Sequence, residues 1–352
     1  MTPRRAIKAL IAFLAILSLQ SLLPSCTFAQ AFLPQRGEGN FSISYQNLFL
    51  RDHFDSSGAR SDVGHIQIHS MLQDVDYGLT GKVAVRLSLP WVISKYDGSA
   101  TNYRFAHVNA QNTDNGSYHN TLQDFKLSVR YNLRARPFLV TPIIEGVIPS
   151  HHYEQFAHST PGADLWEMRL GVGVGRGGLG SLLPMGYFQA EYKYAIVQKH
   201  LDIRPNRSIV RSQFGYIIKR VNLAATKTLQ MTHSGLGFDF VDFPASTRFE
   251  VPPGERWYRH AQISKNSFLT LGFQVGFPLT PSVDFTGAYL TDVWGINGHA
   301  LNRGLVFSVN YNFRTRRYEN RTLTAQACDI YCRKCQEIFR EPNAVNQTLG
   351  MR

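Results

Sequence analysis

The chain has 352 residues, of which 43% are hydrophobic, 12% aromatic and 18% charged, and its formal net charge is +12. Disordered chains carry more charge and fewer aromatic side chains, so this composition excludes disorder for most of the sequence. After the first thirty residues no run of about eighteen apolar residues occurs, which excludes a bundle of membrane-spanning helices. A β-rich chain or a soluble α/β enzyme remains.

The N-terminus has the pattern of an export signal. A basic start is followed by the apolar stretch 9–23 and by the small-residue cleavage motif AQA at 29–31. We therefore predict a signal peptide over residues 1–31 and a mature chain that begins near Phe32. The alternative is lipoprotein processing at Cys26. Because exported chains rarely meet nucleic acid, we expect no nucleic-acid partner and attribute the basic balance to anionic lipid headgroups or solutes.

Alternation of apolar and polar residues dominates the chain from residue 32 to residue 313. In the last such segment, Leu305, Phe307 and Val309 alternate with small or polar residues, which is the two-residue period of a β-strand. The same alternation predicts twelve strands, at residues 40–50, 64–77, 80–94, 120–132, 137–149, 164–177, 184–198, 206–217, 220–232, 262–277, 281–293 and 302–313.

The connectors between these segments alternate in length. An even number of antiparallel strands with alternating short and long connectors is typical of a transmembrane up-and-down β-barrel. We therefore predict an all-β barrel of about twelve strands, with short periplasmic turns and long extracellular loops. A soluble β-sandwich is the alternative, but aromatic residues near the strand ends favour a membrane interface. The long loops are expected at residues 51–62, 95–119, 150–163, 199–205, 233–261 and 294–301.

The final strand ends in two aromatic residues, Tyr311 and Phe313, and a tail of residues 314–352 follows it. The aromatic ending is similar to the signal that the barrel-assembly machinery recognises, so that machinery is an expected partner. In the basic tail, apolar residues and cysteines recur at three- and four-residue steps, which predicts one short amphipathic helix on the periplasmic side. The tail could contact a periplasmic partner. Its three thiols are Cys328, Cys332 and Cys335. They could serve as small apolar groups, form an intermolecular disulfide or bind a metal.

Several segments together resemble a known family. The stretches DVDYGLTGKVAVRLSLPWV, LQDFKLSVRYNL and PIIEGVIPSHHYEQF are similar to those of transporter-like outer-membrane barrels named for the meta-cleavage pathway of phenol degradation. The resemblance covers residues 41–313, and its motifs are architectural rather than catalytic. It implies a barrel in the outer membrane and the passage of small organic compounds. Such a barrel would contact lipid and lipopolysaccharide.

If the apolar residues of each strand face lipid, the charged residues that alternate with them face the lumen. Lumen charges tune the selectivity of pores, or they pair across neighbouring strands and brace the wall. A small excess of cations in the barrel region predicts a mild preference for anionic or neutral solutes. The predicted lumen-facing charges are Arg86, Asp124, Lys126, Arg130, Glu145, Glu167, Arg169, Glu191, Lys193, Arg211 and Asp284.

Signals of catalysis or metal binding are weak by comparison. The segment SHHYEQFAH contains His151, His152 and His158, but a polar loop rarely supplies the fixed geometry of a metal site. Adjacent His–Ser pairs point to opposite faces of a strand and are poor catalytic dyads. The glycines of residues 171–180 alternate along a strand and indicate space inside a curved wall. We therefore predict no catalytic, cofactor-binding or metal-ligating residues and no enzyme activity.

The sequence thus predicts a Gram-negative outer-membrane barrel, residues 32–313, that acts as a passive, porin-like channel for small organic solutes, including aromatic ones. Two alternatives come from other functional classes. One is a closed barrel that serves as a structural or surface-interaction scaffold, and the other is a lipid hydrolase with Ser and His on the lipid-facing wall. A long loop that folds inward would favour gating, whereas one that stands outward would favour partner binding.

Overall fold

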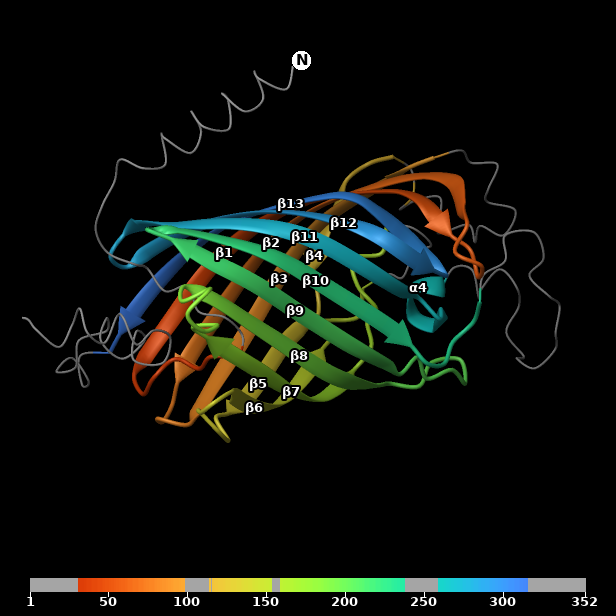
Figure 1. Ribbon diagram of the computed structural model, residues 1–352. Coiled ribbons are helices and arrows are strands. Elements are labelled where there is room, and N and C mark those ends of the chain that lie inside the picture. Colours follow the sequence, from red (N-terminus) through yellow and green to blue (C-terminus); the bar gives the residue numbers. More distant parts are fainter. Residues whose placement is uncertain (1–30, 99–113, 115, 154–158, 238–258, 316–352) are drawn as a thin grey trace, which may run out of the picture.

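The computed structural model of the protein describes residues 31–98, 114, 116–153, 159–237 and 259–315. Within them the strands tilt around a single barrel, and the short helix α4 lies at the end opposite to the end of β13 (Figure 1). No described helix is long and apolar enough to cross a membrane. The elements are β1 (Glu38–Phe54), β2 (Arg60–Gly78), β3 (Val83–Asp97), β4 (His119–Leu122), β5 (Phe125–Tyr131), β6 (Leu139–Ile148), β7 (Glu167–Gly177), β8 (Gly186–Val197), β9 (Arg207–Ile218), β10 (Val221–Thr232), α4 (His260–Ile263), β11 (Ser267–Thr280), β12 (Val283–Ile296) and β13 (Gly298–Arg314).

The strand order runs from β2 through β1 and β13 round to β3, and β2 also pairs with β3, so the sheet closes on itself. All neighbouring strands are antiparallel. β4 and β5 both pair with β3 and follow one another along it, so together they occupy one position in the wall. The break between them falls opposite Pro90, which has no backbone N–H to donate. The thirteen described strands therefore fill twelve positions, which confirms the predicted twelve-stranded, closed, all-β barrel.

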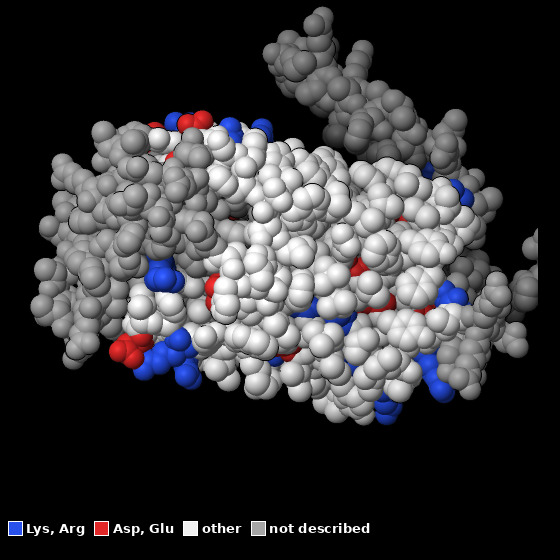
Figure 2. Space-filling view, turned by 180° about the vertical axis from the view of Figure 1, so that it is seen from behind, with Lys and Arg blue, Asp and Glu red and all other residues white. Residues whose placement is uncertain are grey.

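Burial along the strands is the reverse of that in a soluble sheet. Leu127 and Val129 of β5 are 49% and 46% exposed, whereas Ser128 and Arg130 beside them are 5% and 3% exposed. The apolar side chains point outward and the polar ones inward, an arrangement that is stable when the outer surface is covered by hydrocarbon. Uncharged side chains accordingly cover most of the visible face of the barrel (Figure 2).

Two of the expected long loops are tight turns instead. β1 and β2 are joined by residues 55–59, where Asp55 Oδ1 accepts hydrogen bonds from the backbone N–H groups of Ser57 and Ala59 at 2.8 and 2.9 Å. β12 and β13 are joined by Asn297 alone, with φ at 53°, a left-handed conformation that asparagine tolerates. The polar residues beside these turns resemble loop sequence, but they pair in extensions of the wall that contain register shifts.

The predicted start of the strand before residue 277 is wrong, because α4 lies there. The alternation of the sequence predicts a strand from residue 262, yet β11 begins at Ser267, and α4 occupies the four residues from His260 to Ile263. Both described ends of the barrel chain, the start of β1 and the end of β13, lie on the side of the short turns. In bacterial barrels that side is periplasmic, so we name it the periplasmic end and name the end with α4 and the longer loops the extracellular end.

Candidate functional site

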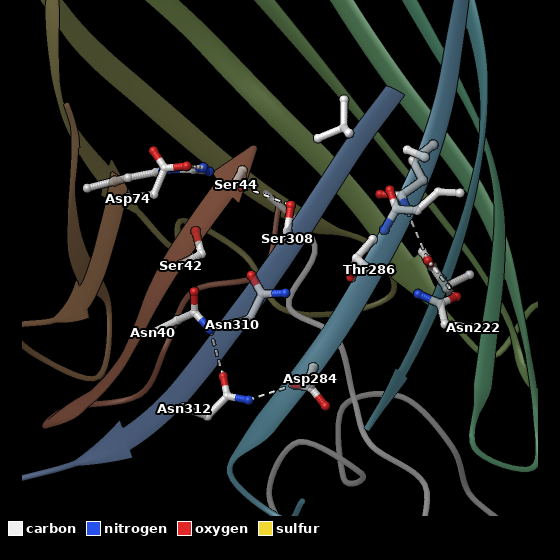
Figure 3. Close-up of a pocket in the computed structure, with 16 residues that line it drawn as sticks. Asn40, Ser42, Ser44, Asp74, Asn222, Asp284, Thr286, Ser308, Asn310 and Asn312 are labelled. Atoms are coloured by element: carbon white, nitrogen blue, oxygen red, sulfur yellow. Dashed lines mark hydrogen bonds and ion pairs between the residues drawn. The ribbon is translucent and has the colours of Figure 1, made fainter. Parts of the chain in front are cut away.

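The lumen holds a polar cavity of about 240 Å³ in its periplasmic half (Figure 3). Strands from both sides of the barrel contribute to it, so it lies across the interior rather than within one wall. The residues that line it are Asn40, Ser42, Ser44, Asp74, Arg86, Tyr187, Gln213, Asn222, Gln274, Asp284, Thr286, Ala288, Val306, Ser308, Asn310 and Asn312.

One side of the cavity is built almost entirely from uncharged hydrogen-bonding groups. Inward positions of adjacent strands face each other in register, so Ser44 and Ser308 share a hydrogen bond of 2.8 Å. Asn40 Nδ2 donates to Asn312 Oδ1 at 2.9 Å, and Asn312 Nδ2 donates to a carboxylate oxygen of Asp284 at 2.8 Å (Figure 3). We call this side the neutral wall, and it comprises Asn40, Ser42, Ser44, Asp284, Thr286, Ser308, Asn310 and Asn312.

Across the barrel from the neutral wall, and outside the set of residues that line the cavity, β6 to β9 carry a chain of ion pairs. Glu145 accepts from Arg169 and from Lys193, each at 2.8 Å. Arg169 also donates to Glu167 at 2.6 Å, and Lys193 lies 2.9 Å from Glu191. Each of these five residues is less than a tenth exposed. With Arg207, which pairs with Glu167, they form the charged wall: Glu145, Glu167, Arg169, Glu191, Lys193 and Arg207.

The predicted lumen charges therefore divide by their partners. Arg86 pairs with Asp74 at 3.1 Å, and Arg130 pairs with Asp76. Lys126 and Arg211 make no ion pair within the described residues, although their charges are close enough to interact electrostatically. The members that belong to the charged wall are Glu145, Glu167, Arg169, Glu191 and Lys193, while Asp124 and Asp284 accept hydrogen bonds from Tyr153 and Asn312.

Three of the partner charges and most of the neutral wall were not predicted from the sequence. Asp74 and Asp76 alternate with Val75 in a predicted strand, and Arg207 begins another, so the same period-two pattern could have found them. The neutral wall has no comparable signal, because Ser, Thr and Asn are as common in loops as at inward strand positions.

A segment before β1 crosses the periplasmic end of the lumen. We call residues 31–37 the inner strap. It leaves β1 beside β2 and reaches the opposite side of the barrel, where Ala31 N–H donates to Gln189 Oε1 and the Ala31 carbonyl accepts from Thr141, both at 3.0 Å. Ala31 is the last residue of the predicted signal peptide, so a mature chain keeps these two contacts only if cleavage falls before Ala31, whereas Phe32 remains in either case. Phe32 is 4% exposed and packs with Ala31 and Leu139.

Glycines of β7 make room for the strap, as the alternating glycines of the sequence suggest. A Cβ added at Gly175 would lie 2.9 Å from Ala31 Cβ and 3.3 Å from the Phe32 ring. A larger residue there would therefore compete with the strap for the same volume.

The extracellular end is covered by loop residues that fold inward. Ser94, on the inner face of β3, donates to the carbonyl of Ser159 at 2.7 Å, and Ser159 is 1% exposed. Gln262 of α4 donates to the carbonyl of Ala163 at 2.9 Å, which joins the two loops. We call Tyr153, residues 159–165 and α4 the outer cover.

Tyr153 anchors the outer cover to the wall. Its hydroxyl donates to Asp124 Oδ1 at 2.6 Å and accepts from the backbone N–H of Asp164 at 2.8 Å. Burial, together with the nearby Asp124 carboxylate, raises the pKa of Tyr153 above its usual value, so the phenol stays protonated and keeps donating.

The histidines of the segment SHHYEQFAH do not form one site within the described residues. His151 bonds to Ser150 and Thr121 while the His152 side chain is 98% exposed, so these two do not converge on one ion, and His158 lies outside the described residues. The rings of Tyr311 and Phe313 stack on the last strand, with centroids 6.1 Å apart. The signal segment before Ala31 and the tail beyond Thr315, with Cys26, Cys328, Cys332 and Cys335, lie outside the described residues.

One Ser–His contact was not predicted. His233 Nε2 lies 2.8 Å from Ser208 Oγ, and the Tyr192 hydroxyl lies 3.1 Å from the same oxygen. Met231, which pairs with Ser208 in the register of β9 and β10, is 40% exposed, and Tyr192 is 43% exposed, so the pair lies on the outward face. A hydrolase also needs a group that orients the imidazole, and within the described residues no hydrogen bond reaches His233 Nδ1.

No known protein family matches the sequence, and no curated protein matches it. Among solved structures, the chain is similar to the COG4313 outer membrane channel from Pseudomonas putida F1, with a TM-score of 0.60 and 11% identity over 82% of this chain and 100% of that one. Weaker likenesses are to the NanC porin, with a TM-score of 0.43 and 12% identity over 79% and 100%, and to the P. putida toluene transporter TodX, with a TM-score of 0.38 and 8% identity over 81% and 92%. The chain has the fold of an outer-membrane β-barrel.

Proposed function

We propose that the protein is a passive outer-membrane channel for small, polar organic solutes, neutral or anionic, and that its two ends open to admit them. The observation that carries the proposal is the polar cavity in the lumen, in a barrel whose two ends are contacted from inside by the inner strap and the outer cover. A barrel that served only as a scaffold would have no reason to keep hydrogen-bonding groups around an empty interior, since burying them without partners costs free energy.

We interpret this conformation as a closed one because of the size of the cavity. At about 240 Å³ it is smaller than the 300 to 1,000 Å³ typical of sites for drug-sized ligands. Passage of a solute therefore requires displacement of the strap, the cover or both. Loops that fold inward are an expected feature of a gated pore, and they oppose the scaffold alternative.

Selectivity is assigned to Lys126 and Arg211. Charges of the charged wall neutralise one another, whereas these two cations have no ion pair among the described residues. Positive charge on a pore wall raises the local concentration of anions. The resemblance to the meta-cleavage family remains part of the proposal. Because Tyr187 is the single aromatic residue among those that line the cavity, an aromatic solute would need polar substituents to bind there.

The test is the reversal potential of the purified protein in a planar bilayer under a salt gradient. We expect discrete, anion-selective openings, and a loss of anion selectivity in the double variant K126Q/R211Q. The control is K82Q/R134Q, which removes the same charge from exposed positions beside the periplasmic turns. Equal selectivity of the two variants would contradict the role of the two cations, and the absence of openings under all conditions would contradict the channel.

The contact between Ser208 and His233 favours a second candidate, hydrolysis of lipid at the outward face. Here Ser208 would be the nucleophile and His233 the general base. The measurement is release of fatty acid from phospholipid vesicles by the wild-type protein and by S208A. Equal release by the two would exclude this activity.

A further inference from the structure

Three histidines from distant parts of the sequence meet at the extracellular end of the barrel. His53 belongs to β1 and His299 to β13, and the two are direct neighbours in the register of these strands. His260 is the first residue of α4 in the outer cover. The ring centroids lie 4.4 Å apart for His53 and His299, 5.3 Å for His260 and His299, and 5.9 Å for His53 and His260.

The spacing of their nitrogen atoms matches that of a metal site. One ligand nitrogen from each ring can be chosen so that all three lie within 4.8 Å of one another. The Nε2 atoms of His260 and His299 are 3.2 Å apart. Two nitrogens bound at about 2.0–2.1 Å to a tetrahedral zinc ion would be separated by about 3.3 Å, so this pair already has the length of a coordination edge.

The outer contacts of the cluster also suit metal binding. His53 Nδ1 lies 3.2 Å from the carbonyl oxygen of Phe54, and since a carbonyl only accepts, the Nδ1 atom carries the proton. The lone pair is then on Nε2. Metal-ligating histidines commonly fix their tautomer in this way, through the nitrogen that does not bind the ion. His53 and His260 are 0% and 2% exposed, so their rings are held by packing rather than free in solvent.

The register shifts of β1 explain how the cluster forms. The pairing of β1 with β13 shifts between Phe49 and Leu50 and again between Leu50 and His53. Such irregularities redirect the side chains that follow them, and they are frequent beside functional sites. A regular strand would not have required the left-handed Asp52, at φ 67°, immediately before His53.

We propose that His53, His260 and His299 form a binding site for a divalent transition-metal ion of the zinc class, with the fourth position open to water or solute. Ions of the zinc class bind neutral imidazole nitrogens well, whereas calcium and magnesium prefer oxygen ligands. Because the ligands come from two wall strands and from α4, the bound ion holds the outer cover against the barrel. The hydrogen bond from Gln262 to Ala163 extends this restraint to the second loop of the cover.

The test measures Zn²⁺ and Co²⁺ binding by the full chain, folded in detergent, after treatment with a chelator. We expect one Zn²⁺ per chain at micromolar concentration and a visible Co²⁺ spectrum of four-coordinate type. H260Q and H299Q should each weaken Zn²⁺ binding by at least about 100-fold, since even the loss of an outer contact costs 10- to 100-fold. The control H152Q removes an exposed histidine and should leave binding unchanged.

Two results would overturn the site. One is binding of less than one Zn²⁺ per chain by the folded wild type, and the other is equal binding by wild type, H260Q and H299Q. Resistance of each variant to unfolding on an unheated gel establishes that the barrel is intact. The measurement does not depend on conductance, so failure of this site and failure of the channel are distinguishable. A further expectation is that Zn²⁺ reduces the opening frequency of the wild type but not of H260Q.

Discussion

The neutral wall and the charged wall face the same lumen but place different kinds of polar side chain in it. In the charged wall the acids and bases pair within about 3 Å and fill the space between β6 and β9. In the neutral wall, serine and asparagine side chains are short, bond to their neighbours and leave the cavity beside them. Under the proposed channel function, this difference assigns bracing of the wall to the ion pairs and the shape of the pore to small uncharged residues.

The inner strap is held by the side of the barrel that carries the charged wall. Its anchors, Thr141 and Gln189, belong to β6 and β8, the strands that also carry the charged wall. The braced side of the barrel thus provides a rigid surface for the strap, and the cavity lies toward the neutral side. Three changes, with effects of decreasing size, test this division.

The largest effect is expected from Gly175→Leu. The new side chain would occupy the volume of the Phe32 ring and displace the strap from β7, because that ring already lies 3.3 Å from an added Cβ. We expect a several-fold increase in single-channel conductance. The matched control is Gly146→Leu, since an added Cβ at Gly146 meets no atom within 4 Å.

Unchanged conductance in Gly175→Leu, with conductance of the wild type established, would show that the strap does not limit the pore. A rise in both glycine variants would instead mean that loosening of the wall, and not removal of the strap, opens the channel.

A smaller effect is expected from Glu145→Gln, compared with Ser308→Ala. Loss of the Glu145 charge breaks two buried ion pairs at once and should lower the free energy of unfolding by about 3 kcal/mol. Loss of the Ser308 hydroxyl removes one neutral hydrogen bond and should cost about 1 kcal/mol. Urea titration of refolding into lipid vesicles measures both values. If Ser308→Ala were the more destabilising variant, the neutral wall would be the brace.

The smallest effect concerns the extracellular hairpin of residues 198–206, beyond the charged wall. Burial, helped by the charge of Arg259, lowers the pKa of His200 from its ordinary value of 6.5. The hairpin therefore keeps its full stability above pH 6.5 and loses stability below it, because the unfolded segment takes up the proton more readily than the folded one.

Hydrogen exchange of the hairpin at pH 7.5 and 5.5, corrected for intrinsic rates, measures this change. We expect lower protection at the acid pH in the wild type and less pH dependence in His200→Gln. Equal pH dependence in the two proteins would mean that His200 does not control the hairpin.

The sequence by itself determined the barrel. Each strand repeats the same two-residue period, so residues such as Leu127 and Ser128 reveal their faces from local pattern alone, and the twelve segments follow. Charges on the inward positions, such as Glu145 and Arg169, were found in the same way. Local pattern failed where polar residues continue a strand, as at His53 and His299, which read as loop but pair in the wall.

The tertiary structure alone decided what lies inside the barrel. The strap, the outer cover and the three histidines bring together residues from positions 31 and 189, 163 and 262, or 53, 260 and 299. No period in the sequence links such residues, because their contacts depend on closure of the barrel and on how loops return into it. The two faces of a strand can be predicted from its own residues, whereas an interior contact between distant segments exists only after the wall that encloses it has formed.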